Sequence, residues 1–254
     1  MKYLIRRTKG MEQKEHGGGL DAVTRRALIE HLGSFVTDHK KNMMDQVLAE
    51  RTDHLALVLE DIYQPHNASA CLRTCECLGV QNIHIIEGRN RYEVNPDVVM
   101  GSVKWLTLHR YREPGRDNTA ACISRLRELG YRVVATSPRA DGYTPEDLPL
   151  DRPAAILFGT EEMGLSTGAL AEADLSLRIP MYGFTESLNI SVSVAVVFSH
   201  LMRRLRASGV PWRLSGEHRE ELRLAWYRKV ISRSADIEKA FLAARGGQCP
   251  KENP

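Results

Sequence analysis

The sequence lacks a hydrophobic run long enough to cross a membrane. No apolar stretch of the 254-residue chain approaches the roughly 20 residues that a membrane-spanning helix needs. Basic residues flank Tyr3, Leu4 and Ile5 near the N-terminus, but no apolar stretch there is long enough for a secretory signal. We therefore expect neither an integral membrane protein nor a secreted one.

Cysteines are few and odd in number: Cys71, Cys75, Cys77, Cys122 and Cys249. An odd count in a chain of this size is more typical of a reducing cytoplasm than of secretion, so we expect a cytoplasmic protein. The first three lack the paired spacing of a zinc site. We therefore expect them to pack within a helix, and we expect no metal.

Aromatic residues are also sparse, at 6% of the chain, but the rest of the composition is ordinary. Hydrophobic residues make up 43% and charged residues 26%, as in most globular proteins. A chain of 254 residues is long enough to bury a large core. The composition excludes a disordered chain, a collagen-like fibre and a disulfide scaffold.

Charge is distributed unevenly along the chain. The net charge is +3 over residues 1–51, −6 over 52–202 and +6 over 203–254. Because polyanions respond to local positive fields, the two basic flanks are candidate surfaces for RNA or DNA. The same Arg and Lys residues are equally typical of ordinary solvated helices.

Short apolar runs alternate with helical stretches in the middle of the chain. Runs of Val, Ile and Leu without polar interruptions are typical of buried parallel strands joined by crossover helices. The predicted strands are Leu55–Leu59, Ile83–Ile86, Trp105–Leu108, Val133–Ala135, Ala154–Phe158 and Leu175–Ile179. The predicted helices between and after them are 66–78, 117–129, 165–172 and 187–206.

Helical patterns also flank this region. Residues 20–51 show helical spacing, with Ser34 or Thr37 as a candidate N-cap, and further helices are predicted at 217–230 and 235–244. The first 19 residues show no sustained period. The sequence thus predicts an α/β core at 53–206 between helical arms at 1–52 and 207–254.

Three loops that follow predicted strands contain residues suited to chemistry. In an open parallel sheet, ligands bind beyond the carboxyl ends of the strands. In the first loop, Asn67 is a candidate helix N-cap, and Arg73 follows six residues later, about 120° away around a helix. Both could therefore border one cleft, although an N-cap followed by a surface arginine explains the pair as well.

The second loop follows Ala154–Phe158. Gly159 at the strand end allows close approach of a ligand, Gly164 permits a turn, and Glu161 lies between them. A tight turn with Ser166 as the next N-cap is the simpler interpretation of this segment.

The third loop runs from Ile179 through a Pro/Gly-containing segment to Ser187, Leu188 and Asn189. Small polar residues there allow either close helix packing or close approach of a ligand. For Ser187 and Asn189, directly behind the loop, packing is the weaker explanation.

Taken together, the three segments resemble the SpoU–TrmH class of the SPOUT methyltransferases. The matching residues are Asn67, Arg73 and Gly79, then Gly159, Glu161 and Gly164, then Ile179-Pro180-Met181 and Ser187-Leu188-Asn189-Ile190-Ser191. The resemblance covers about residues 53–206 and is strongest to the branch that acts on tRNA.

This resemblance implies a parallel-sheet α/β SPOUT fold with a deep C-terminal trefoil knot at about 154–206. It also implies S-adenosylmethionine as cofactor, a homodimer, and methylation of an RNA ribose 2′-hydroxyl. By position, the cofactor contacts are Thr136, Gly159, Ile179 and Leu188. The matched catalytic positions are Arg73, Asn67, Glu161, Ser187 and Asn189.

The helical arms at both ends resemble those of enzymes that methylate guanosine 18 in the D-loop of tRNA. Ribosomal RNA is the alternative substrate, and a catalytically silent, knotted RNA-binding factor is the alternative function. Aromatic and basic residues of the C-terminal arm could meet RNA or could pin the arm to the core. They are Trp212, Arg213, Trp226, Tyr227 and Arg228.

Overall fold

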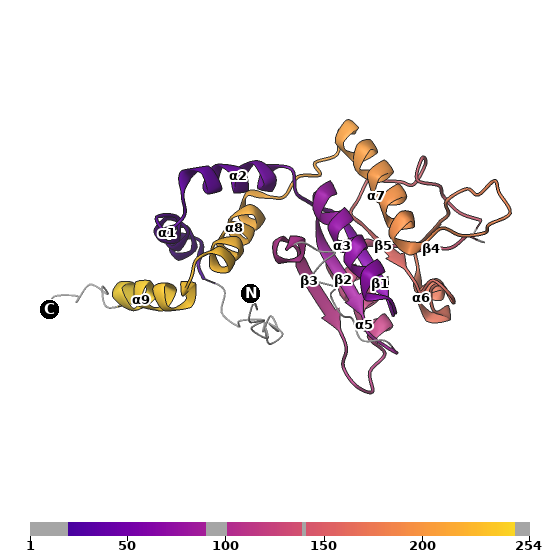
Figure 1. Ribbon diagram of the computed structural model, residues 1–254, viewed down its shortest axis with the longest axis horizontal. Helices are drawn as coiled ribbons and strands as arrows, with labels where there is room; N and C mark the ends of the chain where they lie inside the picture. The colour runs from indigo at the N-terminus through magenta and orange to yellow at the C-terminus, as the bar shows by residue number, and fades with distance from the viewer. Residues whose placement is uncertain (1–19, 90–100, 139–140, 247–254) are drawn as a thin grey trace, which may run out of the picture.

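A six-stranded parallel sheet forms the centre of the molecule (Figure 1). The computed structural model describes residues 20–89, 101–138 and 141–246, so the first 19 residues and Cys249 lie outside it. The strands are β1 (Thr52–Glu60), β2 (Val80–Ile86), β3 (Thr107–Tyr111), β4 (Arg132–Thr136), β5 (Ala154–Phe158) and β6 (Leu175–Leu177). Their order is β3-β2-β1-β5-β4-β6, and every neighbouring pair is parallel, which confirms the predicted parallel sheet.

Helices cover both faces of this sheet and continue beyond it. They are α1 (Ala22–Gly33), α2 (Asp38–Ala49), α3 (Pro65–Leu78), α5 (Asn118–Glu128), α6 (Thr167–Glu172), α7 (Ile190–Ala207), α8 (Gly216–Val230) and α9 (Ser234–Gly246), with a short 3-10 helix η1 at Ser102–Trp105. Within the described ranges, no helix combines the length and the apolar character needed to cross a bilayer.

The two faces of the sheet follow from the alternation of side chains along each strand. On β1, Leu55, Leu57 and Leu59 pack into one core with α3 and α7. Ala56 and Val58 point the other way, into a second core with α5 and α6. Both faces are buried, which explains why the strands appear in the sequence as unbroken apolar runs.

One predicted strand starts in the wrong place. Trp105 belongs to η1 rather than to a strand, and β3 begins at Thr107. The Trp105 ring packs edge-on against Trp226 with ring centroids 5.3 Å apart. The apolar side chain of Trp105 therefore packs against α8 and does not form part of a strand.

The predicted helical segment at 20–51 is two helices. Thr37 caps α2, accepting a hydrogen bond from the Lys40 amide, as the sequence suggested. The Ser34 prediction is wrong, because Ser34 lies at the C-terminal end of α1 and its hydroxyl donates to the His31 carbonyl at 2.7 Å. Asp21 caps α1 instead.

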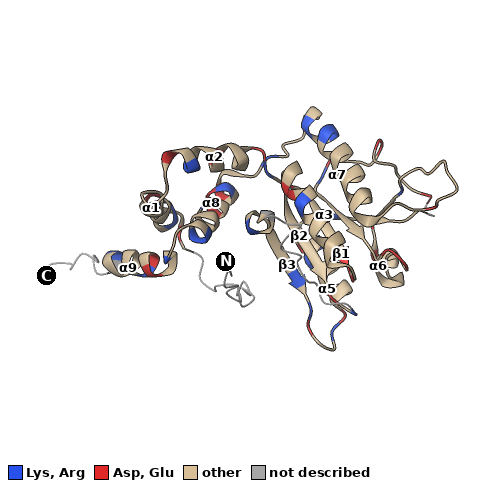
Figure 2. Ribbon diagram, in the orientation of Figure 1, with Lys and Arg blue, Asp and Glu red and all other residues tan. Residues whose placement is uncertain are grey.

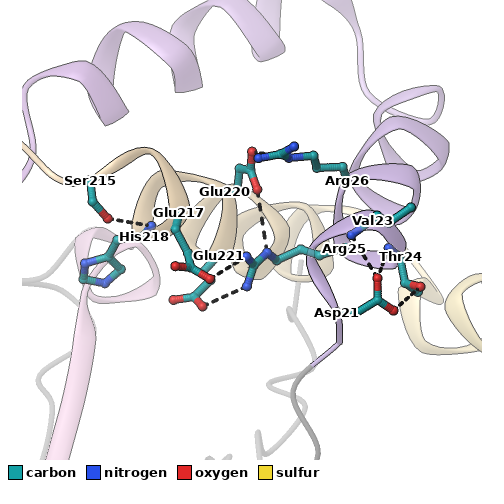
Figure 3. Close-up of polar contacts among 10 residues, drawn as sticks. All are labelled: Asp21, Val23, Thr24, Arg25, Arg26, Ser215, Glu217, His218, Glu220 and Glu221. Atoms are coloured by element: carbon teal, nitrogen blue, oxygen red, sulfur yellow. Dashed lines mark hydrogen bonds and ion pairs between the residues drawn. The ribbon is translucent and has the colours of Figure 1, made fainter.

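The two arms pack against each other beside the sheet (Figure 1). Leu28 and Leu32 of α1, Leu48 of α2 and Leu222 and Trp226 of α8 share one apolar cluster. Buried Arg25 on α1 adds ion pairs to the carboxylates of α8, as Figure 3 shows. The helices before and after the core thus form one helical layer, which we call the arm module (α1, α2, α8 and α9).

Aromatic residues of the C-terminal arm are structural. Trp212, Trp226 and Tyr227 are buried. The Thr52 hydroxyl donates to the Trp212 carbonyl at 2.5 Å and so ties this segment to the first residue of β1. Of the two roles considered for these aromatics, the structure favours pinning the arm.

Candidate functional site

The helix α3 carries the first group of predicted site residues. Asn67 is 4% exposed, whereas Arg73 lies on the exposed surface of α3, fewer than two turns further on. The prediction that Asn67 caps this helix is wrong, because Pro65 occupies the first turn and Gln64 takes the N-cap position. Because proline is favoured at the first position of a helix, α3 begins at Pro65, two residues before Asn67. The Asn67 side chain is therefore directed to the neighbouring loops.

Asn67 joins the three loops by hydrogen bonds. Its amide nitrogen donates to Oε1 of Glu161 at 2.6 Å and to Oε1 of Gln64 at 3.1 Å. Its amide oxygen accepts from the Asn189 amide at 3.2 Å. Residues from three distant parts of the sequence thus form one polar cluster, which we call the Asn67 cluster (Asn67, Glu161 and Asn189).

The loop after β5 folds back on itself. The main chains of Thr160 and Gly164 exchange two hydrogen bonds of 3.0 Å each, and Gly164 has a φ of 70°. A Cβ atom at Gly159 would collide with the Gly164 main chain. Both glycines are therefore required by the turn that presents Glu161.

Asn189 has a second role at the start of α7. Its side-chain oxygen accepts from the Ser191 amide at 2.8 Å and from the Ser191 hydroxyl at 2.6 Å, which makes it the N-cap. Since α7 begins at Ile190, the predicted start at residue 187 is three residues early. Ser187 and Leu188 belong to the exposed loop before the helix.

The four predicted cofactor contacts lie on adjacent strands or on the loop before α7. Thr136 ends β4, Gly159 follows β5 and Ile179 follows β6, and these three strands are neighbours in the sheet. The Thr136 hydroxyl donates to the Leu157 carbonyl at 2.7 Å, so it is already engaged within the sheet. Leu188 is 38% exposed and adds an apolar side chain in the third loop.

Two of the three cysteines of α3 are buried packing residues, and the third is exposed. Cys71 and Cys75 are buried in the core, as predicted, but Cys77 is exposed. Burial raises the pKa of the Cys71 thiol to about 12 and that of Cys75 well above its usual range. Both therefore remain protonated at neutral pH and are poor nucleophiles.

One buried carboxylate near these loops was assigned no role from the sequence. Glu60 ends β1 and is 3% exposed. Its oxygens accept hydrogen bonds from the Ser166 amide, the Ser166 hydroxyl and the Thr119 hydroxyl, all within 2.7–2.8 Å. The available signal was a glutamate that directly continues an apolar strand.

Comparison with known proteins agrees with this architecture. The SpoU rRNA Methylase family matches residues 54–199. The chain is 45% identical over 207 residues to a tRNA (guanosine(18)-2'-O)-methyltransferase of Borreliella burgdorferi, covering 82% of this chain and 93% of the relative. A protein of the same description from Thermus thermophilus is 33% identical over 196 residues, covering 76% and 98%.

A solved structure extends the comparison to the fold. The A. aeolicus TrmH/SpoU tRNA modifying enzyme superposes with a TM-score of 0.67 at 25% identity, covering 77% of this chain and 98% of that one. The family match spans more than half of the chain, and it includes the Asn67 cluster, Arg73 and the loop after β5. This protein belongs to the SpoU methylase family.

Proposed function

We propose that this protein transfers the methyl group of S-adenosylmethionine to the ribose 2′-hydroxyl of guanosine 18 in tRNA. The observation that carries the proposal is the Asn67 cluster. Hydrogen bonds there join Asn67, Glu161 and Asn189 from three loops beside the carboxyl ends of the strands. The substrate is supported by the 45% identical relative, a tRNA (guanosine(18)-2'-O)-methyltransferase of which this chain covers 93%.

The cofactor side of the site is assigned to the loops after β4, β5 and β6. Gly159 lets a ligand approach the main chain, and Ile179 and Leu188 offer apolar surface suited to an adenine ring. Thr136, at the end of β4, completes the set. These residues fit S-adenosylmethionine, which supplies an electrophilic methyl group when bound.

The substrate side is assigned to Arg73. A ribose hydroxyl is a poor nucleophile, so the site must position its oxygen and stabilise the negative charge that develops as the proton leaves. A guanidinium has a pKa above about 12 and is a poor base at neutral pH. Arg73 therefore stabilises the developing alkoxide and holds a nearby phosphate of the RNA.

Glu161 and Asn67 act together in this scheme. The Glu161 carboxylate is exposed and accepts the Asn67 hydrogen bond through one oxygen, which leaves lone pairs for a further proton or donor. The hydroxyl proton is taken up by Glu161, by the substrate phosphate or by water. Ser187, exposed in the third loop, contacts the ribose or its phosphate.

We further propose that the active form is a homodimer. Bulky apolar side chains gather on the loop before α7 and on its first turns, and Tyr182 is 97% exposed. The others are Phe184, Leu188, Val192 and Val196, all exposed. A patch of this kind is suited to a second copy of the chain.

The C-terminal trefoil knot also belongs to the proposal. The segment after β4 runs against β6, with the Tyr143 amide donating to Ser176 and the Arg178 amide donating to Tyr143. Arg204 of α7 donates to the Pro145 carbonyl of the same segment at 2.8 Å. These contacts support a chain that passes through this segment between β6 and α7.

Fewer cations of the arm module are available to bind RNA than the net positive charge of the two terminal segments suggests. Basic and acidic residues are interspersed on α2 and α8, as Figure 2 shows. Many of the cations are engaged in ion pairs, such as Arg25 with Glu217 and Arg223 with Asp45. Some exposed cations of the arm module make no ion pair among the described residues. Examples are Lys40 on α2, Arg219 on α8 and Lys239 on α9. We propose that these cations contact tRNA phosphates. We also propose that the protein acts in the cytoplasm, where its substrate is found.

The test is transfer of labelled methyl from S-adenosylmethionine to unmodified total tRNA and, separately, to unmodified ribosomal RNA. Nuclease mapping then locates the labelled ribose. Label at guanosine 18 of tRNA supports the proposal. Label confined to ribosomal RNA would keep the chemistry and change the substrate. No label in either RNA, with cofactor still bound, would indicate a silent RNA-binding factor.

A further inference from the structure

Glu60 occupies a buried position beneath the loop that presents Glu161. It is the last residue of β1 and lies on the sheet face covered by α5 and α6. Its Oε2 accepts from the Ser166 amide at 2.8 Å, and its Oε1 accepts from the Ser166 hydroxyl at 2.8 Å and the Thr119 hydroxyl at 2.7 Å. Three hydrogen-bond donors hold this buried carboxylate in one fixed orientation.

Two helices begin beside this carboxylate. Thr119 lies in the first turn of α5, and Ser166 is the N-cap of α6, where its hydroxyl also accepts from the Ala169 amide. The positive ends of both helix dipoles therefore lie near Glu60 and favour its negative charge. This offsets part of the cost of burying a carboxylate.

The contacts to Ser166 fix the far end of the loop after β5. The near end begins at Gly159, the turn is closed between Thr160 and Gly164, and Glu161 is held by Asn67. Ser166 follows this turn by two residues. The loop is thus attached at two points, through Asn67 on one side and through Glu60 on the other.

We propose that Glu60 is a positioning residue for methyl transfer. By binding Ser166, it fixes the position of the loop 159–166 relative to the sheet. The positions of the Gly159 main chain and of the Glu161 carboxylate follow from that of the loop. In this proposal Glu60 acts through Ser166 and contacts neither substrate nor cofactor. The inference rests on the proposed function, because it assigns Glu60 to the same cofactor loop.

Two substitutions of Glu60 separate the effect of side-chain length from the effect of its negative charge. Glu60→Asp keeps the charge but withdraws the carboxylate by about one C–C bond, or about 1.5 Å, so that it no longer reaches the Ser166 amide. Glu60→Gln loses the charge but keeps the length. Its amide oxygen can accept from the Ser166 amide, while its amide nitrogen donates to the two hydroxyls, which rotate to accept.

If Glu60 acts by positioning, the shorter side chain is the more harmful. For Glu60→Asp we expect kcat/KM for tRNA to fall by about tenfold or more and the Kd for S-adenosylmethionine to rise, because small displacements in such sites are costly. For Glu60→Gln we expect both values within about threefold of wild type. In the cofactor-free Asp variant, the Ser166 amide should also exchange its hydrogen at least about tenfold faster.

Thr119→Val is the matched control. It removes one donor to Glu60 but leaves both contacts to Ser166, so cofactor affinity and turnover should stay near wild type. If the Asp variant does not fold, Ser166→Ala takes its place, since it removes the hydroxyl contact to Glu60 while keeping the amide contact. The cofactor Kd and kcat should then change in the same direction but less.

Three results would overturn the inference: Asp equal to or better than Gln, all variants within twofold of wild type, or Thr119→Val as damaged as Glu60→Asp. A wild-type protein that methylates no RNA would instead count against the proposed function. Cofactor affinity and the exchange rate at Ser166 would still decide the role of Glu60 in that case.

Discussion

The Asn67 amide donates a hydrogen bond of 2.6 Å to the Glu161 carboxylate, although 94 residues separate the two in sequence. Asn67 is buried, whereas Glu161 is exposed. The buried partner is therefore fixed by packing and determines where the exposed carboxylate lies. A site built this way depends on the amide as a donor, and not only on its size.

Asn67→Asp tests that dependence, since it preserves the shape of the side chain and replaces the donor by a carboxylate. Two facing carboxylates repel, so we expect methyl transfer to fall by about 100-fold at pH 8. The defect should lessen at lower pH, because protonating one carboxylate restores a donor. Gln64→Ala is the control: it removes the other acceptor of the same amide and should change turnover little. A defect independent of pH would contradict this account.

Gly159→Ala tests the turn after β5. The added Cβ would collide with the Gly164 main chain, so the turn must open. We expect the free energy of unfolding to fall by about 1–3 kcal/mol and cofactor affinity to drop more than tenfold. Gly168→Ala, nearby in α6, is the control, because the nearest atom to its Cβ would be the Ser166 hydroxyl oxygen at 3.9 Å. Calorimetry and equilibrium binding on both variants would show whether the effect is specific to the turn.

Arg73→Ala should separate binding from chemistry. Removing the guanidinium takes away stabilisation of developing charge, so we expect methyl transfer to fall by about 1,000-fold or more. The residues proposed to bind the cofactor lie on other segments, so the Kd for S-adenosylmethionine should stay within about threefold of wild type. Isothermal titration and single-turnover assays measure the two quantities. Loss of cofactor binding would remove Arg73 from the substrate side.

The sequence predicted the sheet well because both of its faces are buried. Leu55–Leu59 and Ala154–Phe158 are unbroken apolar runs, and each lies within or coincides with an observed strand. Local signals failed where tertiary contacts decide. Asn67 has the residue type of an N-cap, but Pro65 starts the helix earlier, and its partners Glu161 and Asn189 lie far along the chain.

The arms illustrate the same limit. Arg25 and Glu217 are 192 residues apart, so their pairing cannot be seen in a charge profile. A basic stretch in sequence became, in part, an internal ion-pair network between α1 and α8 (Figure 3). Charge counted along the chain therefore overestimates the basic surface that is open to RNA.

Arg25→Ala tests whether this network holds the arm module together. Arg25 is buried and pairs with Glu217 at 2.8 Å and Glu221 at 3.0 Å, so its loss leaves clustered carboxylates without their cation. We expect the Tm to fall by about 5 °C or more and α1 to become sensitive to protease. Arg26→Ala removes an exposed pair with Glu220 and should lower the Tm by about 1 °C or less. Equal shifts in the two variants would refute a special role for Arg25.

His84 makes the folded state sensitive to acid. It is buried on β2, its Nδ1 lies 3.0 Å from the Tyr111 hydroxyl, and its ring stacks on His109 with centroids 4.4 Å apart. Burial, together with the charges of His109 and Arg125, lowers the pKa of His84 to about 3. The unfolded chain therefore takes up this proton first as pH falls below about 6.5, and the folded state loses stability down to about pH 3.

At pH 5 this loss amounts to about 2 kcal/mol relative to pH 8. His84→Gln should be less stable than wild type at pH 8, because it disturbs the stack, but its free energy of unfolding should fall less steeply between pH 6.5 and 4.5. His39→Gln, on the exposed surface of α2, removes a histidine without a buried contact and should leave the slope unchanged. Urea unfolding across this pH range measures all three slopes. Parallel curves for wild type and His84→Gln would show that another group governs the acid response.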